Sequence, residues 1–184
     1  RLTFLEDGFE RLILYIGRID RGKRCDRILA VAELAFKLKL PWRFIIIGEG
    51  PEHRNLVRIS ERKGLSNRLL LIGAVPHEEI WKYLYAADVF LALPDHACIS
   101  NTLLEALSAG TPVVIRDKGV GLKELLGNAS TNYCLISDPD NIIGIVGCLK
   151  RVIERGKNQM CVKFDTWEQR MLREEEYLSD RGLI

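Results

Sequence analysis

Apolar residues along this chain fall into short continuous runs, separated by longer segments in which they recur with helical spacing. The runs are rich in Ile, Val and Leu and do not alternate with polar residues, which is typical of strands buried on both faces. We therefore expect strands at residues 12–16, 44–47, 69–72, 88–93, 112–115 and, with a weaker pattern, 133–136.

Between these runs, apolar residues recur every three or four positions, as on one face of a helix. Pro41 and Gly110 mark two of the expected helix ends, Gly110 as a left-handed C-terminal cap. The expected helices cover residues 27–40, 52–63, 76–87, 101–109, 122–126, 138–155 and 167–178. Strands that alternate with helices predict an α/β fold, a Rossmann-like doubly wound parallel sheet, over residues 1–184 as one domain.

The composition says more about which partners the chain could bind than about its fold. Of 184 residues, 47% are hydrophobic and 28% charged, as in ordinary globular domains, and the formal net charge of +2 does not favour long nucleic acids. The longest apolar runs have strand length, shorter than a membrane helix needs, and the first residues lack a signal-peptide pattern. The five cysteines are scattered, and we expect reduced thiols in a cytoplasmic setting that fill small core positions. The chain begins without Met, and we expect it to be a piece of a longer protein.

The segment after the first strand has the composition of an anion site. Gly17 lets backbone approach a ligand, Arg18 follows at once, and Lys23 lies near a helix start. Two cations beside backbone N–H groups suit a diphosphate, although the spacing is not that of a Walker A loop. The alternative is a solvated basic loop that includes Arg21, Lys23, Arg24 and Arg27.

A second candidate is the helix expected from Asn101, whose N-terminal amides and dipole would favour an anion at the carboxyl edge of the sheet. Glu105 lies one turn in, among leucines and alanines, and a carboxylate there needs a partner. It could accept hydrogen bonds from a diol such as ribose. It could equally pair with a lysine or complement the helix dipole, and the residues alone leave these readings open.

Four stretches in order resemble the C-terminal half of retaining glycosyltransferases of the GT-B fold, in the large family numbered four. They are residues 15–23 (YIGRIDRGK), 47–51 (IGEGP), 71–75 (LIGAV) with 84–88 (LYAAD), and 101–114 (NTLLEALSAGTPVV). Residues 164–167 (FDTW) resemble the family's ending. Each stretch is weak evidence alone, but four in register over nearly the whole chain are specific.

The resemblance implies a donor-binding domain whose roles can be carried over residue by residue. Arg18 and Lys23, next to Gly17, would hold the diphosphate of a nucleotide-sugar and stabilise it as it leaves. The amides near Asn101, Thr102 and Leu103 would contact the phosphates, and Glu105 the ribose hydroxyls. The backbone of Gly73, Ala74 and Val75 would meet the base. No metal or other cofactor would be needed.

The chain also departs from the family's pattern in two places. The family commonly has two glutamates spaced E-x7-E, and the position eight residues before Glu105 is Ala97. Because the first glutamate normally contacts the transferred sugar, Asp95 or His96 would have to substitute, and we favour Asp95. The alternative for Asp95 is a turn-forming residue after Pro94. The family's Lys-Gly is Lys23-Arg24 here.

The resulting expectation is transfer of a sugar, such as mannose, glucose or a similar hexose, from a nucleoside diphosphate to a hydroxyl acceptor with retained anomeric configuration. Residues 165–184 would form a helix that crosses to an N-terminal domain, which would carry the acceptor site. This chain alone would therefore bind donor but not catalyse sugar transfer. Peripheral membrane association of the whole protein is common among the relatives. The alternatives are a non-catalytic nucleotide-sugar-binding module and a GT-B-like nucleotide-sugar epimerase.

Overall fold

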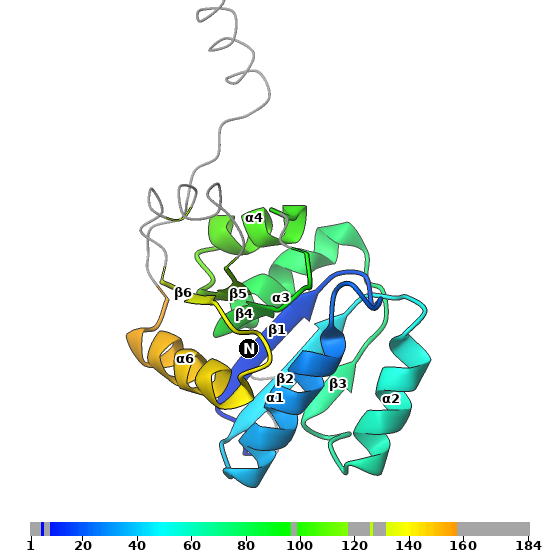
Figure 1. Cartoon of the computed structure of the whole chain (residues 1–184). Coiled ribbons are helices and arrows are strands. Elements are labelled where there is room, and N and C mark those ends of the chain that lie inside the picture. The colour runs from blue at the N-terminus through cyan, green and yellow to red at the C-terminus, as the bar shows by residue number, and fades with distance from the viewer. Residues whose placement is uncertain (1–4, 6–7, 97–98, 118–125, 127–131, 158–184) are drawn as a thin grey trace, which may run out of the picture.

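A computed structural model describes residues 5, 8–96, 99–117, 126 and 132–157. In this part of the chain, six parallel strands form one sheet in the order β3-β2-β1-β4-β5-β6 (Figure 1). The strands are β1 (Arg11–Ile16), β2 (Trp42–Ile47), β3 (Leu69–Leu71), β4 (Val89–Ala92), β5 (Val113–Arg116) and β6 (Tyr133–Ile136). The order runs outward in both directions from β1 and β4, which confirms the doubly wound, Rossmann-like sheet.

Helices cover both faces of this sheet, so the domain has three layers (Figure 1). One face carries α1 (Cys25–Lys37), α2 (His53–Arg62) and α6 (Ile142–Arg155). The other carries α3 (Ile80–Ala86), which follows the 3-10 turn η2 (His77–Glu79), and α4 (Asn101–Ser108). No helix among the described residues is both long and apolar enough to span a bilayer.

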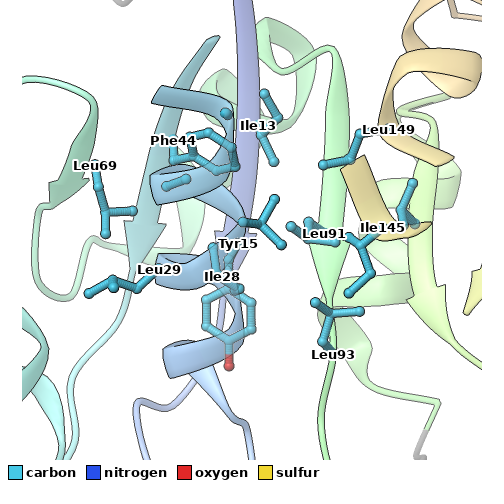
Figure 2. Packing of buried hydrophobic residues seen from close by; sticks show 14 of the residues in the cluster. Ile13, Tyr15, Ile28, Leu29, Phe44, Leu69, Leu91, Leu93, Ile145 and Leu149 are labelled. Atoms are coloured by element: carbon cyan, nitrogen blue, oxygen red, sulfur yellow. The ribbon is translucent and has the colours of Figure 1, made fainter. Parts of the chain in front are cut away.

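Successive residues of the central strands pack into two separate cores. In β1, Ile13 and Tyr15 face the α1 side, whereas Leu12 and Leu14 face the α4 side. Figure 2 shows the first core, in which Phe44 of β2 packs beside Ile13 and Tyr15. All four β1 residues are at most 3% exposed, which explains why the strands read as unbroken apolar runs.

The helix boundaries differ from the expected ones by a few residues. Helix α1 begins at Cys25 and ends at Lys37, because Lys39 turns the chain with a positive φ of 55° before Pro41. The expected helix 76–87 is divided into η2 and α3. Gly110 has φ 66° and closes α4, as its predicted cap role requires. The expected helices 122–126 and 167–178 lie, except for Leu126, outside the described residues.

Candidate functional site

The candidate site lies at the carboxyl edge of the sheet, where the strand order reverses between β1 and β4. In doubly wound sheets this switch point is where ligands bind. The loop after β1 and the segment after β4 meet there, since the Asp95 amide donates a 2.8 Å hydrogen bond to the Gly22 carbonyl. Two segments far apart in the sequence and both predicted to bind the donor are therefore neighbours.

Gly17 allows the backbone to pack tightly where β1 ends. Its φ is 154°, and its amide donates to the Ile47 carbonyl at 2.9 Å. A Cβ at Gly17 would lie 2.9 Å from the Tyr15 hydroxyl, and one at Gly48 would overlap the Gly17 carbonyl oxygen. Glycine is thus required at position 48, where a Cβ would clash with backbone, and is favoured at position 17 by the positive φ.

The two predicted phosphate-binding cations lie on a loop with a well-anchored backbone. The Arg18 side chain is 72% exposed, with Nε 3.5 Å from Oδ2 of Asp20, while its carbonyl accepts from the Tyr15 hydroxyl at 3.0 Å. The Lys23 amide donates to Oδ1 of Asp20 at 3.0 Å. Arg18 therefore presents an exposed guanidinium, and the turn formed by Asp20 sets the path of the chain at Lys23.

Arg24 adopts the left-handed conformation, with φ 53° and ψ 47°, immediately before α1. This conformation costs a residue with a Cβ about 1–2 kcal/mol, which is why glycine is favoured at such positions. The guanidinium donates from Nε to Asp26 at 2.9 Å and from Nη1 to both oxygens of Asp95 at 3.2 Å. These charge-assisted bonds offset the backbone cost at the position where the family pattern has glycine.

Asp95 is the centre of a cluster of three arginines. Its Oδ1 lies 2.9 Å from Arg27, 3.2 Å from Arg24 and 3.4 Å from Arg116. Burial raises the pKa of Asp95, but hydrogen bonds from Arg24 and Arg27 outweigh it and hold the pKa below its ordinary value. The carboxylate is thus ionised and occupied by protein donors, and its predicted contact with sugar hydroxyls stays a prediction.

The alternative interpretation, a solvated basic loop, included Arg27, and for this residue it is wrong. Its side chain is only 5% exposed, and it donates to the Leu93 carbonyl at 2.9 Å and to Asp140 at 2.8 Å. The signal that could have revealed it is helical spacing, since Arg27 precedes the buried Val31 by one turn. Asp140, with a pKa lowered by its hydrogen bonds to Arg27, escaped sequence analysis because the two residues are far apart in the chain.

Helix α4 presents its N-terminus to the same edge. The Ser100 hydroxyl accepts from the Leu103 amide at 3.2 Å, so Leu103 is already engaged by a side-chain cap. Helix geometry leaves the amides of Asn101 and Thr102 without an intrahelical acceptor. All three predicted phosphate-facing amides therefore lie in the first turn of α4, and Leu103 is the one that a side-chain cap already binds.

Glu105 has a side chain that is only 20% exposed. Among the described residues, its charged or polar side-chain neighbour is His77, whose Nε2 lies 3.6 Å from Oε1, rather than a lysine. Because His77 is 76% exposed, this pair contributes little stability. A largely covered carboxylate with so weak a partner is suited to bind hydroxyl groups of a ligand.

Gly73, Ala74 and Val75 lie beyond the end of β3, next to the end of β2. The Gly48 amide donates to the Gly73 carbonyl at 2.7 Å, and Ala74 is exposed. His77, two residues after Val75, reaches Glu105. The predicted base-contacting segment and the predicted ribose-binding residue are therefore adjacent, as they must be if both contact one nucleoside.

A groove of about 390 Å³ lies between the β1–α1 loop and α2. It is bordered by Asp20, Arg24 and Asp95 and reaches Leu56 and Ile59 of α2. Glu105 and residues 73–75 are not part of its lining, so the groove shares Asp95 and the β1–α1 loop with the site but does not reach the proposed nucleoside-binding residues.

Two sequence predictions lie outside the described residues: Ala97, at the position of the family's first glutamate, and the helix 165–184. Within the described ranges, no group of three or more His, Cys, Asp or Glu side chains could hold a metal ion. The prediction that the reaction needs no metal stays a prediction.

The family model for glycosyl transferases group 1 matches residues 4–165. The chain belongs to this family. The match includes every residue predicted for the donor site, from Gly17 to Glu105.

Curated glycosyltransferases are similar over most of the chain. The 2-deoxystreptamine glucosyltransferase of Streptomyces kanamyceticus is 30% identical over 145 residues, which are 78% of this chain and 36% of that protein. A Campylobacter jejuni enzyme named as an N-acetylgalactosaminyltransferase acting on a diphospho-undecaprenol is 28% identical over 84% of this chain and 40% of its own length. The chain thus spans well under half of the length of these relatives.

Solved structures with the same fold are glycosyltransferases as well. TarM from S. aureus, in a complex that contains UDP, has a TM-score of 0.69 at 24% identity over 79% of this chain and 29% of its own. The C-terminal domain of a group 1 glycosyltransferase from Francisella tularensis has a TM-score of 0.67 at 21% identity, and the match covers 83% of this chain and 81% of that domain. These likenesses establish the α/β, Rossmann-like fold, which this chain shares with glycosyltransferases of the GT-B type.

Proposed function

We propose that this chain is the donor-binding domain of a retaining glycosyltransferase that moves a hexose from a nucleoside-diphosphate sugar to a hydroxyl acceptor. The proposal rests on one contact. The Arg18–Lys23 loop lies against the segment that leads into α4, and the hydrogen bond between Asp95 and Gly22 joins them. Two cations and a helix N-terminus at one sheet edge form an anion site. Membership of the family supports the same role.

In the proposed site, Arg18 and Lys23 bind the diphosphate. They stabilise the charge that develops on the nucleoside diphosphate as the glycosidic bond breaks, which is electrostatic stabilisation of the transition state rather than proton transfer. Cationic side chains and the dipole of α4 take the place that a metal ion would otherwise fill. The amides of Asn101 and Thr102 face the phosphates, and the Leu103 amide, bound to the Ser100 hydroxyl, holds the first turn of α4 in place beside them.

Glu105 accepts hydrogen bonds from the ribose hydroxyls in this proposal, and the backbone of Gly73, Ala74 and Val75 contacts the base. The adjacency of His77 and Glu105 supports this arrangement. Asp95 remains a candidate for a sugar contact from the segment after β4.

The whole reaction would require a second domain with the acceptor site, to which residues 165–184 would cross. Relatives matched over about a third of their length are named as transferring glucose or N-acetylglucosamine, which favours a hexose or hexosamine donor. We propose a cytoplasmic location, with the membrane face as the place of a lipid-linked acceptor. This chain alone should bind donor without turnover.

The test is calorimetric titration of the chain with UDP, GDP and ADP and with the matching nucleotide-sugars, together with thermal unfolding in the presence of each ligand. Saturation at 100 times Kd should add about 2.7 kcal/mol of stability and raise Tm by roughly 5–10 °C. Arg18→Ala and Lys23→Ala should weaken binding of one diphosphate strongly. The matched controls Arg62→Ala and Lys150→Ala, at exposed positions on α2 and α6, should not.

Absence of binding to every nucleoside diphosphate at millimolar concentration would contradict the proposal. Sugar transfer by this chain alone, above the level of the Arg18→Ala/Lys23→Ala variant, would contradict the need for a second domain.

A further inference from the structure

Both chain neighbours of Lys23 are bound by the same distant residue. The Gly22 carbonyl accepts the Asp95 amide at 2.8 Å, and the Arg24 guanidinium binds both carboxylate oxygens of Asp95 at 3.2 Å. Lys23 therefore lies between two residues, Gly22 and Arg24, that both bind Asp95 in the segment after β4.

Arg24 links Asp95 to the backbone of the loop, because its side chain binds Asp95 and its backbone directly follows Lys23. It is left-handed, and its guanidinium contacts Asp26 on its own helix and Asp95 across the sheet edge. The Asp26 contact is local, two residues along the chain, and cannot place the loop relative to β4. The Asp95 contact spans 71 residues of sequence and can.

Asp95 is itself fixed by arginines from two other elements. Arg116 of β5 donates to the Pro94 and Asp95 carbonyls at 2.9 and 2.8 Å, and Arg27 of α1 donates to the Leu93 carbonyl at 2.9 Å. The carboxylate also lies 2.9 Å from Arg27. These contacts tie the segment 93–95 to both α1 and β5.

We infer that Asp95 is a positioning residue, which sets the place of Lys23 at the diphosphate through Arg24 and Gly22. The inference rests on the proposed donor function, because it assigns Asp95 a task at that same site. It differs from direct sugar binding by Asp95, in which the carboxylate would touch the donor. The two roles predict opposite responses to a nucleotide that carries no sugar.

The experiment is a double-mutant cycle on binding of the free nucleoside diphosphate, measured by calorimetry with this chain. Asp95→Asn keeps the size and the amide bond to Gly22, and Arg24 and Arg27 keep Asp26 and Asp140 as partners. Arg24→Gly removes the guanidinium and introduces a residue that adopts the left-handed conformation without strain. Each variant should weaken binding about fivefold, the size usual for coupling within one ion-pair network.

In a Lys23→Ala background, Asp95→Asn should cause no further loss of affinity. Glu61→Gln, which removes one exposed carboxylate from α2, is the matched control and should change nothing. If Asp95→Asn fails to fold, Arg24→Gly with and without Lys23→Ala completes the same cycle.

Additive losses from Lys23→Ala and Asp95→Asn would overturn the inference. So would an Asp95→Asn variant that binds the free diphosphate normally but loses affinity for the nucleotide-sugar, since that result identifies a direct sugar ligand. If the unchanged chain binds no nucleoside diphosphate, the proposed function fails first and the inference with it. That outcome differs from the one that overturns the inference alone, in which the unchanged chain binds the nucleoside diphosphate but the losses from Lys23→Ala and Asp95→Asn are additive.

Discussion

Nε2 of His77 lies 3.6 Å from Oε1 of Glu105, and this contact joins the segment after β3 to the second turn of α4. The two residues are far apart in the chain, and neither strand order nor helix spacing alone brings them together. Their proximity puts the proposed base-contacting backbone beside the proposed ribose ligand. Because the two side chains come from different segments, substitution of each residue tests its role separately.

Replacement of Glu105 by Gln should weaken binding of the preferred nucleoside diphosphate by at least about tenfold, because hydrogen bonds to a charged acceptor are lost. The same replacement should have much less effect on the 2′,3′-dideoxy form of the nucleotide. Calorimetric titration of both ligands measures the difference.

His77→Ala is the control for Glu105, because an exposed pair at this distance adds little stability. We expect the free energy of unfolding of His77→Ala to stay within about 0.5 kcal/mol of the unchanged chain. Equal losses of affinity for the ribose and dideoxy nucleotides in Glu105→Gln would show that Glu105 does not contact the ribose.

Removal of the Ser100 cap should lower both stability and nucleotide affinity. Ser100→Ala loses the acceptor of the Leu103 amide, which should cost about 1 kcal/mol of unfolding free energy in urea titrations. Asn141→Ala removes the equivalent cap of α6, where Oδ1 accepts the Gly144 amide at 2.9 Å. This variant should lose similar stability but bind nucleoside diphosphate normally, since α6 begins away from the site. Equal effects of both variants on binding would argue against a role for the α4 N-terminus.

Acid should destabilise the chain through the aspartates that bind Arg27. The pKa values of Asp95 and Asp140 are lower in the folded state than the ordinary value of about 3.9. Their contribution is therefore fully present above that value and is lost as pH falls through the folded pKa. Urea midpoints measured from pH 6 down to pH 2 should fall less steeply in Asp95→Asn and in Asp140→Asn than in the unchanged chain. Parallel curves would show that these pairs do not contribute.

Cys25 should resist alkylation while the chain is folded. Its side chain is buried, and burial raises its pKa to about 12, so little thiolate exists at pH 8. Peptide mapping after iodoacetamide treatment should find Cys25 unmodified in the native chain and modified in urea. Cys134, which is half-buried, should react before Cys25 in the native chain. Equal rates of Cys25 modification with and without urea would contradict its buried position.

Local patterns predicted the elements of the fold well, because each depends on residues close in sequence. The run 12–16 became β1 with every inner residue buried, and Gly110 closed α4 as predicted. Family motifs named the donor residues, and the structure brings Lys23, Glu105 and Gly73 to one edge of the sheet through the contacts of their neighbours.

Charge pairing could not be predicted in the same way. Arg27 and Asp140 form a two-point ion pair, yet 113 residues separate them. Arg24 reads as one more basic loop residue until its positive φ and its contact with Asp95 are known.

The sequence by itself determined the strand and helix order, the buried faces and the residues that could meet a diphosphate, because periodicity and glycine placement act over a few positions. Only the tertiary structure decided which carboxylate each arginine binds and that Glu105 lies beside His77. Those pairings depend on which strands become neighbours in the sheet. Parallel order β2-β1-β4-β5 joins distant segments at a common edge, where the electrostatic energy of each group is set by neighbours that sequence distance does not reveal.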